Sequence, residues 1–128
     1  MKKKLLSVLS VSLIFTLICA IGACAVTPRW SYIGSVDLTI DRNGDEYFTT
    51  VACGSNVTKI EVEMELYQKG ILGTYSKKAS HSETVYSSSA IVADSYDMNP
   101  NKTYRMDVTV TVTTSSGQTE TAEVSHTV

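Results

Sequence analysis

Cysteine, histidine and proline are scarce in this 128-residue chain, which has three cysteines, two histidines and two prolines. Cys19 and Cys24 lie in the apolar N-terminal segment, so Cys53 alone remains and has no partner for an intramolecular disulfide. Such a thiol is expected to be a small buried hydrophobic side chain. A catalytic thiol would need a histidine partner, and neither His81 nor His126 lies in a nucleophile motif. We therefore expect a fold held together by its core.

The chain also lacks an excess of basic residues. It has 11 Lys and Arg against 13 Asp and Glu, and without the three N-terminal lysines, Lys2–Lys4, the balance is 8 − 13 = −5. Nucleic-acid binding needs a basic face that displaces counterions from phosphate, so the acidic balance argues against it. The same balance argues against adsorption to an anionic membrane surface.

The first 25 residues have the pattern of a secretory signal peptide. Lys2–Lys4 form a positive segment, Leu5–Ile21 is apolar apart from three serines and a threonine, and Ala23–Ala25 places alanine at both positions that signal peptidase recognises. The apolar run is also long enough to be a retained membrane anchor. The abrupt A-x-A ending and the polar sequence after it favour cleavage instead. We expect residues 1–25 to be removed and residues 26–128 to form one exported domain.

A second processing signal overlaps the first. Ile21-Gly22-Ala23-Cys24 resembles the lipobox of bacterial lipoproteins, in which the cysteine receives lipid and becomes the new N-terminus. Glycine is a less usual residue at the second position of that motif, and the A-x-A frame is intact. Secretion into the extracellular medium is therefore favoured, and lipid anchoring at Cys24 on the cell envelope is the alternative.

The hydrophobic period from Trp30 onward is two, which is typical of strands with one buried face. Residues 59–66 alternate apolar and charged side chains, residues 104–112 alternate with high β-branched content, and Asn43-Gly44 predicts a hairpin turn. About seven strands without a helix predict an all-β fold, an antiparallel β-sandwich. The expected strands are 31–40, 46–53, 59–66, 75–79, 85–93, 104–112 and 119–128.

The stretch from Met98 to Val108 resembles the approach to the sixth strand in fibronectin type III and related immunoglobulin-like domains. There, an apolar residue, a proline turn and a tyrosine precede an alternating strand, as Met98, Pro100 and Tyr104 do here. The resemblance implies immunoglobulin-like or fibronectin type III-like strand order, with the Tyr104 hydroxyl bonded back to the backbone at this corner. The chain departs from the pattern because Trp30 precedes the first strand and no tryptophan lies on an early core strand.

The chain is also similar to small exported single-domain sandwich proteins of Gram-positive bacteria. The shared features are Pro28–Ile33 at the start, a single cysteine at position 53, the alternating strand 57–68 ahead of a glycine turn, and Thr103–Arg105. Members of that group lack an assigned activity. The resemblance implies the fold and the compartment, and it implies no site.

Two acidic segments are candidates for ion binding. Asp41–Glu46 carries the D-x-N-x-D opening of a calcium loop, but its glycine is fourth instead of sixth and Ala52 stands where the closing glutamate belongs. A polar hairpin turn is therefore favoured. Glu61, Glu63 and Glu65 form a row spaced about 7 Å apart. This row either meets a cationic partner or, as we favour, is a solvated face that discourages edge-to-edge aggregation.

No catalytic, cofactor-binding or metal-binding residue is assigned, and no cofactor is expected. His81 is expected in a loop and His126 near the C-terminus, so a two-histidine zinc site would need a long-range contact and further ligands. The triplets beginning at Asn56 and Asn101 match the N-glycosylation pattern. With a leader of bacterial type, both asparagines are interpreted as turn residues.

Seven tyrosines against two phenylalanines are the one indication of a binding face, because tyrosine tolerates a wet edge. Tyr67, Tyr75, Tyr86 and Tyr96 lie in or near the middle strands, where cross-strand packing is the simplest role and an external cluster would mark a contact. We expect a non-enzymatic binding module at the cell surface or in the medium, with an unknown protein or glycan partner. The alternative is a structural envelope component that self-associates through an edge strand, which residues 85–93 would permit.

Overall fold

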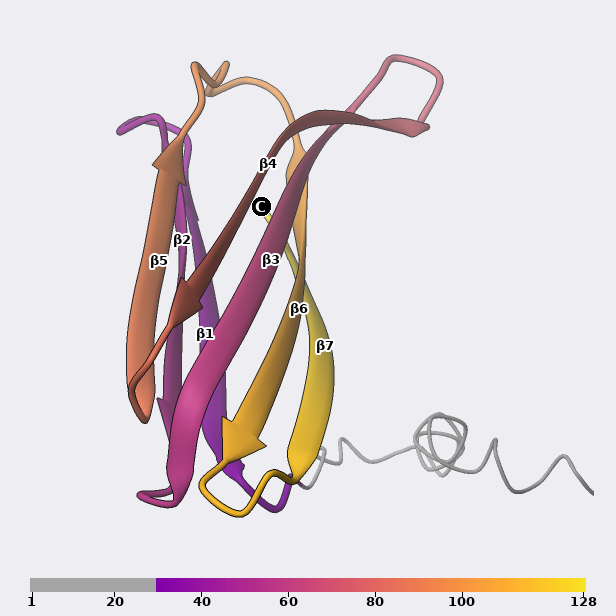
Figure 1. Ribbon diagram of the computed structural model, residues 1–128. Helices are drawn as coiled ribbons and strands as arrows, with labels where there is room; N and C mark the ends of the chain where they lie inside the picture. Colours follow the sequence, from indigo (N-terminus) through magenta and orange to yellow (C-terminus); the bar gives the residue numbers. More distant parts are fainter. Residues whose placement is uncertain (1–29) are drawn as a thin grey trace, which may run out of the picture.

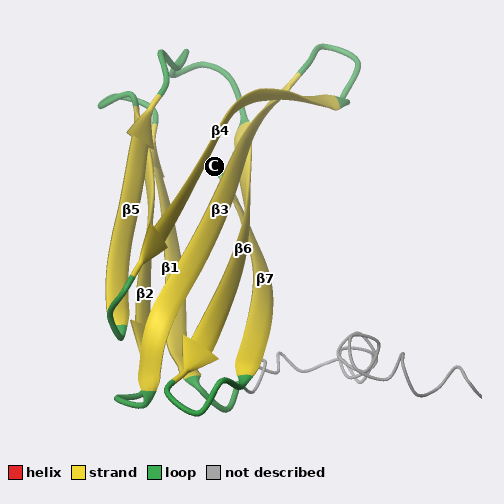
Figure 2. Cartoon of the chain, viewed as in Figure 1, coloured by secondary structure: helices red, strands yellow, loops and turns green. Residues whose placement is uncertain are grey.

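Seven β-strands and no helix form in residues 30–128, which are the residues that the computed structural model describes (Figures 1 and 2). The proposed leader, its cleavage site and the lipobox lie outside the described residues. The strands are β1 (Ile33–Asp41), β2 (Glu46–Cys53), β3 (Val57–Lys69), β4 (Tyr75–Val85), β5 (Ser89–Ser95), β6 (Tyr104–Thr114) and β7 (Thr119–Thr127).

The strands form two antiparallel sheets that face each other across one core. The smaller sheet has the order β1-β2-β5 and the larger has the order β4-β3-β6-β7. The chain passes between the sheets at the β2–β3, β4–β5 and β5–β6 connections (Figure 1). The predicted antiparallel β-sandwich is confirmed.

The core follows from the two-residue period of the strands. Strand β6 alternates without interruption, and its inward residues from Tyr104 to Val112 are all buried. Strand β3 buries its even-numbered residues from Ile60 to Leu66, as predicted. Each such aliphatic side chain contributes about 1.5–3 kcal/mol when it leaves water. The smaller sheet contributes Tyr47, Val51 and Val92 to the opposite side of this core.

Two polar contacts, one buried and one partly buried, complete the packing of β2. The Thr49 hydroxyl donates to Met64 Sδ at 3.2 Å and so joins the two sheets through the core. The Tyr47 hydroxyl donates to Asp94 Oδ2 at 2.9 Å on the neighbouring strand β5. Burial and this hydrogen bond raise the pKa of Tyr47 well above its usual range, so the phenol stays protonated.

The corner before β6 has the predicted tyrosine contact. The Tyr104 hydroxyl accepts the backbone N–H of Asn99 at 2.8 Å and donates to Gln68 Oε1 at 3.2 Å. The bond from the hydroxyl to the upstream backbone, which the resemblance of residues 98–108 implied, is therefore present.

Strands form at both predicted positions 75–79 and 85–93, but the predicted bounds are wrong. Strand β4 continues to Val85, and β5 begins only at Ser89 after a turn. The register between β3 and β4 shifts by one residue, because Leu66 faces Ala79 whereas Tyr67 faces Lys77. A bulge of this kind moves the outward side chains from odd to even positions, so the alternation appears to end inside the strand.

The two ends of the sandwich carry different segments. Trp30 and the β2–β3, β4–β5 and β6–β7 turns lie at one end, as the strand directions require. The β1–β2 turn, the β3–β4 loop, the β5–β6 loop and the C-terminus lie at the other, where the β3–β4 hairpin projects beyond the remaining strands (Figure 1). Among residues 30–128, no helix is long and apolar enough to cross a membrane.

Candidate functional site

Two tyrosines and an arginine form a cluster on the outer face of the larger sheet. The guanidinium carbon of Arg105 lies 4.6 Å from the ring centroid of Tyr67 and 4.7 Å from that of Tyr75. All three side chains are partly exposed. We call Tyr67, Arg105 and Tyr75 the tyrosine-arginine stack. Each cation–π contact of this kind contributes about 0.5–1 kcal/mol at an exposed site.

Strand register brings these residues together. Tyr67 on β3 is directly opposite Arg105 on β6, and Tyr75 on β4 is opposite Lys69, two residues further along β3. Neighbouring strands lie about 4.8 Å apart, so one long side chain from each strand reaches the next. The bulge in the β3–β4 pairing keeps Tyr75 on this outer face while Ala79 packs against the core.

The arginine is oriented by a carboxylate on its own strand. Arg105 Nε donates to Asp107 Oδ1 at 3.0 Å and Nη2 donates to Asp107 Oδ2 at 3.2 Å, a two-point contact. The Ser125 hydroxyl on β7 donates to the same Asp107 Oδ1 at 2.8 Å. The guanidinium plane is therefore held in place without any ligand.

A second network borders the stack. The Tyr67 hydroxyl donates to Glu65 Oε1 at 2.8 Å, and Lys77 Nζ donates to Glu65 Oε2 at 3.2 Å. The hydrogen bond from Tyr67, followed by that from Lys77, lowers the pKa of Glu65. The same carboxylate raises the pKa of Tyr67 and of Lys77. At neutral pH the cluster therefore holds two cations and two carboxylates in fixed partnerships.

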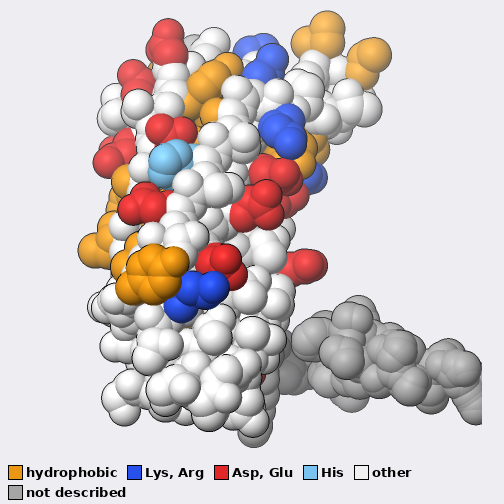
Figure 3. Space-filling view, viewed as in Figure 1, with side chains coloured by type: hydrophobic (Ala, Val, Ile, Leu, Met, Phe, Trp, Pro, Cys, Tyr) orange, Lys and Arg blue, Asp and Glu red, His pale blue; other side chains and the backbone are white. Residues whose placement is uncertain are grey.

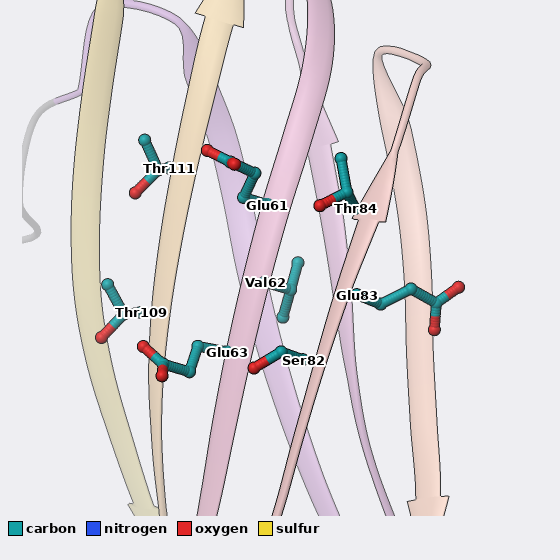
Figure 4. Close-up of a pocket in the computed structure, with 8 residues that line it drawn as sticks. All are labelled: Glu61, Val62, Glu63, Ser82, Glu83, Thr84, Thr109 and Thr111. Carbon is teal, nitrogen blue, oxygen red and sulfur yellow. The ribbon is translucent and has the colours of Figure 1, made fainter.

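The predicted row of glutamates lies on this outer face. Glu61 and Glu63 project beside Thr109 and Thr111 of β6, and the hydroxyls of β4 line the other side of a shallow groove (Figure 4). Glu61 pairs with Lys59 at 3.9 Å, whereas Glu65 belongs to the network at Tyr67. The groove offers carboxylates and hydroxyls, and no group of three metal-ligating side chains is gathered within residues 30–128.

The structure does not bring the two histidines together. His81 lies within β4, and not in the predicted loop, with its Nε2 atom 3.4 Å from Glu83 Oε1. His126 lies on β7, the opposite edge of the same sheet. Three strand spacings of about 4.8 Å separate the two edges, which places them about 14 Å apart. The loop prediction failed because β4 is an exposed edge strand with few apolar residues.

Cys53 is only half-buried at the end of β2, not fully buried as predicted. Burial, with a smaller contribution from nearby Glu120, raises the pKa of the Cys53 thiol. The side chain is packed against the core. It is therefore protonated at neutral pH and poorly suited to nucleophilic chemistry.

The calcium-loop pattern is a hairpin turn, as favoured from the sequence. Asp41 Oδ1 accepts the backbone N–H groups of Asn43 at 3.1 Å and of Gly44 at 3.0 Å. Asp45 Oδ1 accepts the N–H of Met98 at 2.9 Å. Asp41 thus stabilises the backbone of the turn, and Asp45 ties the turn to the β5–β6 loop. Asn56 and Asn101 also lie in turns, as predicted.

Two further features were not found from the sequence. Ile71 and Leu72 lie at the end of the projecting β3–β4 hairpin and are 92% and 88% exposed (Figure 3). The sequence signal was two aliphatic residues between glycines, which we interpreted only as a turn. The other feature is Glu120, whose carboxylate accepts three backbone N–H groups from residues 31–33.

Tyr86 and Tyr96 do not join the stack. Tyr86 is exposed in the turn after β4, and Tyr96 packs against the core from the β5–β6 loop. The external tyrosine cluster therefore consists of Tyr67 and Tyr75. Comparison with known proteins adds no identification, since no protein-family model, curated protein or solved structure significantly matches this chain.

Proposed function

We propose that this protein is an exported, non-enzymatic binding module whose contact surface is the tyrosine-arginine stack, with a protein or glycan as partner. The observation that carries the proposal is the contact of the Arg105 guanidinium with both the Tyr67 and the Tyr75 ring on an outer sheet face. Tyrosine and arginine are enriched among residues that dominate binding energy. Tyrosine rings also present flat apolar faces with a polar edge, which suits both protein and sugar surfaces.

The order of the stack before binding supports the same role. Asp107 and Ser125 fix Arg105, and Glu65 fixes Tyr67, so little side-chain freedom remains to be lost. An immobilised flexible side chain costs about 0.5–1.5 kcal/mol on association, and a preordered one avoids most of that cost. The partner would therefore meet a rigid surface.

The replacement Arg105→Ala is expected to weaken binding to intact cells of the organism that makes the protein by at least about tenfold. The loss follows because both rings lose the cation that holds them. The measurement is saturation binding of the labelled exported protein to those cells, before and after protease or glycosidase treatment. Treatment that removes the binding sites identifies the partner as protein or glycan.

Thr111→Ala is the matched control, because Thr111 lies on the same outer face but outside the stack. Its binding should equal that of the original protein. An Arg105→Ala variant that keeps its cooperative unfolding and binds cells with unchanged affinity would contradict the proposed surface.

The competing role is self-association in the cell envelope, and one observation favours it. Strand β5 is an edge of the smaller sheet, carries Asp94 as its one charged residue, and exposes 70% of Ile91. Edges with so little charge can pair with further strands. Ile91→Lys separates the two roles in the cell-binding measurement. A module that acts through the stack should bind cells as before, whereas a component that assembles through β5 should lose its binding to cells.

We also propose that the protein is released into the medium after cleavage following Ala25. Support comes from the A-x-A frame and from the polar chain that follows it. The intact mass of the protein from medium and membrane fractions should show a species beginning at Val26 in the medium. A membrane-bound species beginning with diacylated Cys24 would establish the alternative, a lipid-anchored envelope protein.

We further propose that the sandwich has fibronectin type III-like order, as in the small exported proteins of Gram-positive bacteria that the sequence resembles. Support comes from the division into β1-β2-β5 and β4-β3-β6-β7 and from the Tyr104 corner. This order places β4 on the larger sheet, where it supplies Tyr75 to the stack.

A further inference from the structure

The loop that joins β3 and β4 presents its two largest side chains to solvent. We define the hairpin tip as residues Gly70–Thr74. Ile71 and Leu72 are 92% and 88% exposed, the highest values among large apolar side chains of the described residues. Figure 3 shows hydrophobic side chains at the end of this projection, clear of the body of the domain.

The backbone of the tip holds these side chains outward. The N–H of Gly73 donates to the carbonyl of Gly70 at 3.0 Å, which makes Ile71 and Leu72 the two corner residues of a turn. The N–H of Gly70 donates to the carbonyl of Thr74 at 2.7 Å and closes the loop. Gly73 has a φ of 86°, a conformation that glycine adopts without strain. Corner positions usually carry polar or small residues, so two aliphatic residues here are exceptional.

Charge is segregated around the tip. The segment Leu66–Ala79 contains three lysines and no acidic residue, whereas the other described residues contain four Lys or Arg and 13 Asp or Glu, a balance of 4 − 13 = −9. Lys77 is paired with Glu65 at 3.2 Å. Within residues 30–128, Lys69 and Lys78 form no ion pair. The hairpin is therefore a cationic projection of an otherwise acidic domain.

We propose that the hairpin tip docks this protein on an anionic lipid surface, with Ile71 and Leu72 inserted among the acyl chains and Lys69 and Lys78 at the headgroups. Ile71, Leu72, Lys69 and Lys78 all lie outside the tyrosine-arginine stack, which borders the hairpin at Tyr75. An acidic net charge disfavours membrane adsorption only where the charge is spread evenly over the protein surface. Here an anionic surface attracts the hairpin and repels the rest of the domain, so the hairpin approaches first.

The order of side chains along the hairpin matches the layers of a bilayer. The aliphatic pair is foremost, and Tyr75 follows beside Lys69, its partner on β3. Lys77 and Lys78 lie about 7 and 10 Å behind Tyr75, at roughly 3.3 Å per residue, and so within about one Debye length of the anionic surface. A headgroup layer is about 5–8 Å thick, and tyrosine and lysine concentrate at that depth. A protein partner would instead need an apolar pocket shaped to a convex tip.

Vesicle binding tests the proposal. The exported protein is sedimented with vesicles of phosphatidylcholine alone and with vesicles that also contain phosphatidylglycerol. We expect binding to the anionic vesicles only, weakening as salt is raised. Ile71→Ser combined with Leu72→Ser should lower the partition coefficient at least about tenfold. Lys69→Gln and Lys78→Gln should each lower it about fivefold, the effect of one cation near such a surface.

Ile91→Ser is the matched control, because Ile91 is also largely exposed but lies on the smaller sheet. It should bind vesicles like the original protein. A second readout is Leu72→Trp, whose added emission should shift to shorter wavelength on anionic vesicles. Trp30 lies at the other end of the sandwich, so the original protein should show no such shift.

Equal binding to both vesicle types, no binding to either, or binding that survives the double serine replacement would overturn the lipid proposal. Recognition of the tip by a protein would give the second of these results. Because the charge of Arg105 is paired with Asp107 and Arg105 lies outside the tip, Arg105→Ala should leave vesicle binding unchanged. Cell binding by Arg105→Ala therefore tests only the stack, and vesicle binding by the tip variants tests only the tip. Failure of one proposal thus leaves the other to be judged by its own measurement.

Discussion

Tyr104→Ala is expected to lower the free energy of unfolding by about 3–5 kcal/mol, as for other large aromatic residues removed from a core. The Tyr104 ring is 0% exposed at the start of β6, between the two sheets. Alanine would leave a cavity there and would also deprive the Asn99 N–H and the Gln68 side chain of their partner. The measurement is equilibrium unfolding in urea, with the slope of the transition compared between variants.

Tyr104→Phe separates the two contributions. Phenylalanine keeps the ring and removes only the hydroxyl, so it should cost about 1–2 kcal/mol. If the alanine and phenylalanine variants were equally destabilised, the hydrogen bonds and not the packing of the ring would be the main contribution of Tyr104.

Glu120→Ala should cost about 2–4 kcal/mol, because one carboxylate there serves three backbone donors. Its Oε2 atom accepts the N–H of Ser31 at 2.7 Å, and its Oε1 atom accepts those of Tyr32 at 2.8 Å and Ile33 at 3.0 Å. Glu120 is on β7 of the larger sheet, whereas Ile33 begins β1 of the smaller one. The carboxylate therefore joins the two sheets where the described chain enters the fold.

Hydrogen exchange gives a local readout for Glu120. In the Glu120→Ala variant the amides of Tyr32 and Ile33 should lose protection before those of β6. Glu123→Ala is the control, since Glu123 is exposed on the same strand and should change stability by less than about 0.5 kcal/mol. Unchanged protection of Tyr32 and Ile33 in Glu120→Ala would contradict this role.

Strands with a strict two-residue period could be predicted from the sequence. In β3 and β6 the apolar residues lie on one face over the whole predicted stretch, and Asn43-Gly44 indicates the first hairpin locally. Strand β4 could not be bounded, because its bulge shifts the pattern by one residue and most of its side chains are exposed. An edge strand has little apolar signal to detect.

The candidate site was less accessible to sequence reasoning than the fold. The sequence singled out Tyr67 and Tyr75 as possible members of an external tyrosine cluster. It gave no indication that Arg105 would contact them. Its contact with both rings depends on the register of β3 with β6 and on the bulge in the pairing of β3 with β4. Pairings between distant strands are properties of the tertiary structure, and no local pattern encodes them.

Trp30 and the hairpin tip lie at opposite ends of the sandwich, so the length of the strands determines how far apart they are. Strand β3 alone has 13 residues, or about 40 Å at roughly 3.3 Å per residue. A form tethered at Cys24 and standing upright would hold the tip that far above its own bilayer, facing a neighbouring cell or vesicle. A freely diffusing form has no such orientation and can meet any surface. Processing at the N-terminus would thus determine whether the same tip adheres to one membrane or bridges two.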